Sequence, residues 1–140
     1  MGKRSPLVEM TSYGIYTQWD SRSKSLPKIQ NFTTDVAADI DVEFGFIINI
    51  KRAKGKVIEF CIQHPGILGK KGEALEAFTG DVHINNNDWE FYLGDTIWDP
   101  IEDKIGPWIM SISLDGVVIA KKTFHVHAQD EGHFWKKRGF

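Results

Sequence analysis

The chain has 140 residues, of which 41% are hydrophobic and 12% aromatic, and this composition is that of one globular domain rather than a disordered segment. Its formal net charge of −2 gives no reason to expect nucleic acid as a partner, since nucleic-acid-binding domains usually present a strongly basic face. No run approaches the ~20 apolar residues of a membrane-spanning helix, so we expect no membrane partner either.

Cysteine usage and the N-terminal residues both bear on the compartment. Cys61 is the single cysteine, which excludes an intrachain disulfide and favours a reducing environment. The opening residues MGKRSPLVEM are not followed by an apolar run of signal-peptide length. We therefore expect a cytoplasmic protein, provided that no leader was removed ahead of this numbering.

The first segment to alternate in hydrophobicity covers residues 8–19, where Tyr13, Ile15, Thr17 and Trp19 are separated by small or polar residues. This pattern predicts a strand. Residues 20–34 follow, rich in Ser, Lys and Asn, and predict a loop.

The strongest strand signal covers residues 40–50, in which every even position is hydrophobic. A period of two over this length places one face in a core and the other mostly in water. Residues 53–55 offer a turn, and residues 57–62 predict a return strand with its even positions on one face. Pro65 ends that strand, because proline has no amide hydrogen to donate to a sheet.

The middle of the chain alternates between connections and short strands. Residues 66–80 predict a long connection, with one helical turn over residues 72–78 as an alternative for part of it. Residues 82–84 predict a short edge strand, and residues 88–94 a strand with Trp89, Phe91 and Leu93 on one face. Residues 95–105 predict a loop.

Residues 106–126 predict a β-hairpin, because hydrophobic even positions lead into Asp115-Gly116, a pair suited to a two-residue turn. Such a turn pairs Leu114 with Val117 and Ile112 with Ile119, which places odd positions of the return strand on the core face. Phe124 and Val126 are even, however. Either a β-bulge near Lys121-Lys122 switches the faces, or the turn is one residue longer.

About seven short strands without a convincing long helix favour an all-β fold, an immunoglobulin-like antiparallel β-sandwich. An α+β roll is the alternative if residues 68–78 form a helix. We expect a sandwich domain over residues 1–128 and a separate aromatic and basic tail over residues 129–140, where the composition changes.

Three segments carry a resemblance to a known family: DVEFGFIINIKRAKGKVIEFCIQHP (41–65), GDTIWDPIED (94–103) and the hairpin of residues 106–126. Together they resemble a bacterial domain of unknown function, the 3859 family, over about residues 12–127. Gly94-Asp95-Thr96-Ile97-Trp98 is the most specific part. The resemblance implies a small β-rich bacterial domain and supplies no activity, cofactor or catalytic residue.

The acid-rich loop around Trp98 is the first candidate binding site. Asp95, Asp99, Glu102 and Asp103 surround this tryptophan. Oxygen ligands in a loop can hold calcium, but the spacing does not match an EF-hand. Two other interpretations are that Trp98 closes one end of the sandwich while the acids face water, and that the loop recognises a partner.

His125 and His127 are the candidate metal ligands, because alternate positions of a strand project from the same face. His133, Glu131 or His83 would be the third ligand. Two ordinary surface histidines are the simpler interpretation, since no cysteine pair or HExxH helix supports a site.

No catalytic residues are predicted. Cys61 lies between Phe60 and Ile62, where a lone cysteine is usually a small apolar filler, and His64 is badly placed to act as its base. The glycines are scattered at turns and form no phosphate-binding loop. We expect a protein that is not an enzyme and uses no cofactor.

The tail is the remaining candidate interaction element. Phe134, Trp135 and Phe140 are interleaved with Lys136, Lys137 and Arg138, and exposed aromatic groups tend to mark a partner surface. The sequence therefore predicts a non-enzymatic binding or protein-interaction module that uses an unknown protein partner or self-association through this tail. Metal binding at His125 and His127, and carbohydrate binding on exposed tryptophans, are the alternatives.

Overall fold

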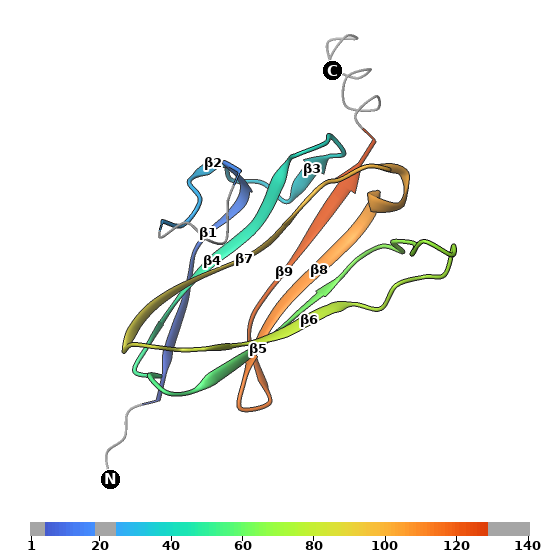
Figure 1. The fold of residues 1–140 in the computed structure, drawn as a ribbon. Coiled ribbons are helices and arrows are strands. Elements are labelled where there is room, and N and C mark those ends of the chain that lie inside the picture. Colours follow the sequence, from blue (N-terminus) through green and yellow to red (C-terminus); the bar gives the residue numbers. More distant parts are fainter. Residues whose placement is uncertain (1–4, 19–24, 129–140) are drawn as a thin grey trace.

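The alternating segments form two β-sheets that pack face to face, as Figure 1 shows for a computed structural model that describes residues 5–18 and 25–128. In chain order the strands are β1 (Leu7–Tyr16), β2 (Ile29–Asn31), β3 (Asp35–Ala37), β4 (Glu43–Lys51), β5 (Val57–Gln63), β6 (Phe78–His83), β7 (Asp88–Thr96), β8 (Gly106–Leu114) and β9 (Val117–His127), with a 3-10 turn at Glu102–Lys104. The four-stranded sheet has the order β2-β1-β4-β7 and the five-stranded sheet the order β3-β9-β8-β5-β6. Among the strands of the described residues, only β3 and β9 pair in parallel.

This architecture confirms the predicted all-β sandwich, with nine strands rather than about seven. The additional strands β2 and β3 have three residues each, and β2 lies inside the segment predicted as a loop. Residues 72–78 form no helix, so the α+β alternative is wrong; Ala74 instead makes an isolated β-bridge with Leu68. In the described ranges no helix is long and apolar enough to cross a membrane.

The core lies between the sheets and is centred on β4. Its inner face presents Phe44, Phe46, Ile48 and Ile50, all fully buried, as the even-position pattern predicts. Ile40 precedes the strand and is exposed, and the opposite face, predicted to lie mostly in water, is buried at Glu43 and Ile47. The Phe44 ring contacts Trp108 of β8 at 5.2 Å and Phe124 of β9 at 5.5 Å between ring centroids, both edge-to-face. These contacts join the two sheets near the end of β7, where Phe44 pairs with Asp95.

The β8–β9 hairpin has the predicted two-residue turn, since Asp115 (φ 53°) and Gly116 (φ 79°) both adopt left-handed backbone angles and Leu114 pairs with Val117. The predicted pairing of Ile112 with Ile119 is wrong. Ile112 pairs with Ala120, because the register shifts by one residue between Val118 and Ala120. A bulge therefore does switch the faces, but it lies closer to the turn than Lys121-Lys122.

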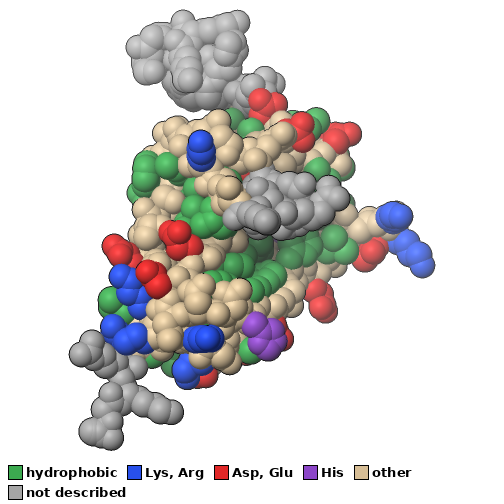
Figure 2. All heavy atoms as spheres, turned by 60° about the vertical axis from the view of Figure 1, so that its left-hand side comes forward, with side chains coloured by type: hydrophobic (Ala, Val, Ile, Leu, Met, Phe, Trp, Pro, Cys, Tyr) green, Lys and Arg blue, Asp and Glu red, His purple; other side chains and the backbone are tan. Residues whose placement is uncertain are grey.

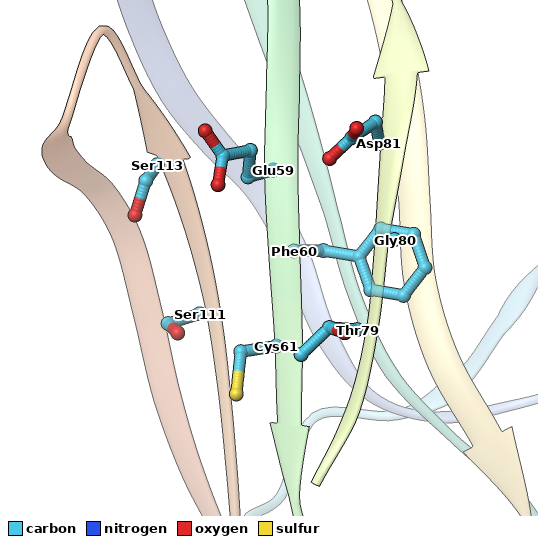
Figure 3. Close-up of a pocket in the computed structure, with 8 residues that line it drawn as sticks. All are labelled: Glu59, Phe60, Cys61, Thr79, Gly80, Asp81, Ser111 and Ser113. Carbon is cyan, nitrogen blue, oxygen red and sulfur yellow. The ribbon is translucent and has the colours of Figure 1, made fainter.

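β6 and β7 form one edge of the sandwich. Each is the outermost strand of its sheet, and a short turn joins the two (Figure 1). Gly80 of β6 pairs with Phe60 of β5, and the Phe60 ring lies across it (Figure 3). A Cβ atom added at Gly80 would come within 2.6 Å of that ring. Glycine is thus what allows Phe60 to reach across β6 to this edge.

We expect Gly80→Ala to lower the free energy of unfolding by about 1–2 kcal/mol, because the methyl group displaces the Phe60 ring. In a Phe60→Leu background the same change should cost much less, since the nearest atoms to the new methyl belong to the ring. Urea unfolding of the four proteins gives the coupling. Equal costs in both backgrounds would contradict this packing.

Candidate functional site

Partly exposed aromatic side chains follow the edge between β6 and β7. This aromatic edge consists of Phe60 of β5, Phe78 of β6, Trp89 and Phe91 of β7, and Trp98 just beyond β7. Trp89 stacks on Phe91 with 5.2 Å between ring centroids, and Phe91 lies 6.4 Å from Phe60 of the other sheet. Phe78 lies 6.5 Å from Trp98, whose side chain is 37% exposed.

The backbone along this edge is also free to pair. Within the described residues β7 pairs only with β4, and β6 only with β5. Each strand therefore has one row of amide and carbonyl groups that no strand covers, which is a template for pairing with another segment. Figure 2 brings forward the side of the molecule that carries the four-stranded sheet, and hydrophobic side chains form a band across the middle of that view.

The Trp98 loop is held by a buried lysine that the sequence did not single out. Lys104 is fully buried, and its Nζ donates to the Pro100 carbonyl at 2.8 Å and to Asp103 Oδ1 at 2.6 Å. The same Nζ lies 4.3 Å from the centroid of the Trp98 ring, a cation–π contact. Trp108 Nε1 donates to the Lys104 carbonyl at 2.8 Å, which ties the loop to the core.

The acids predicted around Trp98 do not converge. Asp99 and Glu102 are exposed, whereas Asp103 accepts hydrogen bonds from Lys104 and from the Leu68 amide. Desolvation alone would raise the pKa of Asp103, but these two hydrogen bonds outweigh it and lower the pKa. Asp103 is thus the counter-ion of Lys104.

Asp95 does not belong to the loop, contrary to the sequence-based expectation. It lies in β7 opposite Phe44, on the same face as the buried Leu93, and its Oδ1 accepts from the Thr96 amide at 2.8 Å. Burial raises the pKa of Asp95 to about 6; the charge of Glu43 adds to the rise, while the Thr96 amide, His64 and Lys104 oppose it. Asp95 is thus a half-buried acid at the Trp98 end of the edge, with a pKa raised toward the neutral range.

Glu43, the other acid near Asp95, is buried on the outer face of the four-stranded sheet. It accepts hydrogen bonds from Tyr92 Oη at 2.6 Å and Thr96 Oγ1 at 2.7 Å. Burial and then the charge of Glu43 raise the pKa of Tyr92, so the phenol stays a donor. Tyr92 reaches Glu43 over Gly94, where a Cβ atom would come within 2.1 Å of the hydroxyl.

His64 also belongs to the Trp98 end, although the sequence singled it out only as a badly placed base for Cys61. Its Nδ1 accepts from the Ile67 amide at 2.9 Å, so Nε2 carries the proton that is shared with the Glu76 carbonyl at 3.0 Å. Its ring lies 5.0 Å from Phe78 and 6.5 Å from Trp108. Both nitrogens are engaged in holding residues 64–76, which leaves neither for catalysis in this conformation.

The histidine pair projects away from the core, since Phe124 and Val126, which alternate with the two histidines, are buried while His125 is exposed and His127 half-buried. Asp35 and Ala37 of β3 are their register partners. Among residues 5–18 and 25–128, no three His, Cys, Asp or Glu side chains come together as a metal site would require. His133, Glu131, Phe134 and Trp135 lie outside the described residues, as does Trp19.

A shallow polar hollow of about 460 Å³ lies on the outer face of the five-stranded sheet (Figure 3). Its lining includes Glu59, Cys61, Thr79, Asp81, Ser111 and Ser113. Cys61 faces this hollow and is half-buried, so its interpretation as an apolar filler is wrong. No histidine lines the hollow to activate the thiol or a hydroxyl group.

Replacing Lys104 with alanine should lower the free energy of unfolding by about 3–5 kcal/mol, because Asp103 and the Pro100 carbonyl lose their partner in a buried setting. Lys56 is the matched control: it pairs with Asp115 at 2.8 Å, but the two side chains are 43% and 69% exposed. Lys56→Ala should cost under about 1 kcal/mol in the same urea titration. Similar costs for both variants would contradict the role given to Lys104.

Asp95→Asn should stabilise the protein near pH 7. Because the folded state raises the pKa of Asp95 from 3.8 to about 6, it binds the proton more tightly than the unfolded state does. Stability from this group is therefore full below about pH 4 and is lost as the pH rises through about 6, a loss of about 3 kcal/mol. Urea unfolding from pH 4 to 8 should show this fall in the native protein and not in Asp95→Asn, with the exposed Asp99→Asn as control. The same pH profile in all three proteins would overturn the assignment.

Comparisons with known proteins agree with this fold. An immunoglobulin-like protein from Pseudomonas aeruginosa superposes with a TM-score of 0.72 at 18% sequence identity, covering 91% of this chain and 100% of the other. A Pseudomonas fluorescens alkylpurine DNA glycosylase bound to abasic-site DNA reaches a TM-score of only 0.44 at 8% identity, over 68% of this chain and 28% of that one, which is too low to carry a conclusion. No curated protein matches the chain. The model of the family described as Domain of unknown function (DUF3859) matches residues 4–126, so the chain belongs to this family, as its resemblance predicted.

Proposed function

We propose that the domain is a non-enzymatic interaction module that binds an extended segment of a protein along the aromatic edge. One observation carries the proposal: five partly exposed aromatic side chains coincide with two unpaired strand edges. The free backbone supplies the hydrogen bonds of strand addition, and the aromatic side chains supply apolar contacts that select the segment. The half-buried thiol of Cys61 fits a reducing, cytoplasmic setting.

The alternatives gain less support from the geometry. A metal site at His125 and His127 would need a third ligand from beyond the described residues. A carbohydrate platform would need several exposed rings, but Trp108 is fully buried, Trp89 half-buried, and Trp98 is the exposed tryptophan of the described residues. A peptide that pairs with a strand needs a free strand edge and partly exposed rings, which is what the described surface offers.

The test is site-specific photo-cross-linking in cells that normally make the protein. A benzophenone amino acid at Phe91 should cross-link to a discrete partner, identified by mass spectrometry, whereas the same group at Val118 should not. Val118 is the control because it is 57% exposed and lies on β9, away from β6 and β7.

Trp89→Ala should reduce the Phe91 adduct about tenfold or more, as truncation of a central interface aromatic usually does, and Val118→Ala should leave it unchanged. Circular dichroism verifies that each variant folds. Equal adducts from positions 91 and 118, or an adduct that does not respond to Trp89→Ala, would refute the proposal.

A further inference from the structure

The described part of the chain ends at the end of the sandwich that carries the Trp98 loop. The His127 carbonyl accepts from the Ala38 amide at 2.8 Å, and three residues later the Asp41 amide donates to the Ile97 carbonyl at 2.9 Å. The end of β9 and the start of the Trp98 loop therefore lie at the same end of the sandwich. The segment that follows, residues 129–140, lies outside the match to the family model, which ends at residue 126.

Charge on the two edge strands is of one sign. β6 and β7 carry Asp81, Asp88, Glu90 and Asp95 and contain no lysine or arginine. Residues 129–140 contain Lys136, Lys137 and Arg138 together with Phe134, Trp135 and Phe140. The aromatic edge and this segment thus match in both respects, aromatic with aromatic and acidic with basic.

We infer that residues 129–140 bind the aromatic edge of their own chain, an inference that rests on the proposed function of that edge. Their aromatic side chains pack against Phe78, Phe91 and Trp98, and their basic residues face the acids of β6 and β7.

The reach of the segment suffices for this contact. His127 and Phe78 are separated by three strand spacings, from β9 through β8 and β5 to β6, and by about five residues along the strands. With spacings of about 4.8 Å and about 3.3 Å per residue this is a path of roughly 22 Å. An extended chain from Ala128 reaches roughly 24 Å at Trp135 and roughly 40 Å at Phe140.

The short tether also favours binding to the edge of the same chain over binding to the edge of a second copy. A short tether gives the segment an effective concentration in the millimolar range at its own edge. A second copy at micromolar concentration cannot compete with this. The segment would then occupy the surface to which an outside partner binds.

The test is a benzophenone amino acid at Trp135 in the full-length protein, irradiated at several protein concentrations. Peptide mapping should find cross-links from this position to residues 78–98 within monomers, at a yield that does not depend on concentration. Phe91→Ala should reduce this yield several-fold, and Val118→Ala should leave it unchanged. Cross-links to other faces, or cross-links that appear only in dimers and increase with concentration, would overturn the inference.

A second readout separates this inference from the proposed function. If the segment occupies the edge, Trp135→Ala should increase the partner adduct at position 91 several-fold. A partner adduct that Trp135→Ala leaves unchanged would overturn the inference and leave the proposed function intact. Cross-links from position 135 without any partner adduct at position 91 would overturn the proposed function and leave this inference intact.

Discussion

The packing of Phe44 against Trp108 and Phe124 is the constraint on which the rest of the structure depends. Phe44 belongs to the four-stranded sheet and the other two rings to the five-stranded sheet, and all three are fully buried. This contact holds the two sheets face to face, and the order of the strands within each sheet then sets which strands meet at the margins. β6 and β7 meet at one margin, where half-buried aromatic rings take the place of a covering strand.

The Trp98 end follows from the same contact. The indole of Trp108 donates to the Lys104 carbonyl, so the position of Trp108 in the core sets the position of the loop. Lys104 then holds Pro100 and Asp103 and lies against Trp98. Asp95 is directly opposite Phe44 in the sheet, which is why a carboxyl group there is buried. A substitution at Trp108 or Phe44 should therefore also alter the packing at the Trp98 end of the aromatic edge.

Local patterns predicted the strands well and the candidate site only in part. In β4 and in the β8–β9 hairpin, hydrophobic and polar residues alternate along the chain itself, so the core faces of these strands could be predicted. Phe60, Trp89 and Phe91 also alternate as core residues do, but whether a core position lies at the margin depends on strand order, which no local pattern contains. The burial of Lys104 escaped prediction for a related reason: its partners are peptide and carboxylate groups of a loop whose course is set by Trp108. Asp95 was misplaced because the predicted strand ended at residue 94, whereas Gly94 pairs with Gly45 and β7 continues to Thr96.

Hydroxyl-radical footprinting tests most directly whether the aromatic edge binds an aromatic and basic segment. The oxidation rates of Trp89, Phe91 and Trp98 would be compared between the native chain and a variant with Phe134, Trp135 and Phe140 replaced by serine. We expect a several-fold increase at these three residues in the variant and no change at Phe32, which is 59% exposed and packs on Tyr13 of β1. Unchanged rates along the edge, or a uniform increase that includes Phe32, would show that residues 129–140 do not bind there.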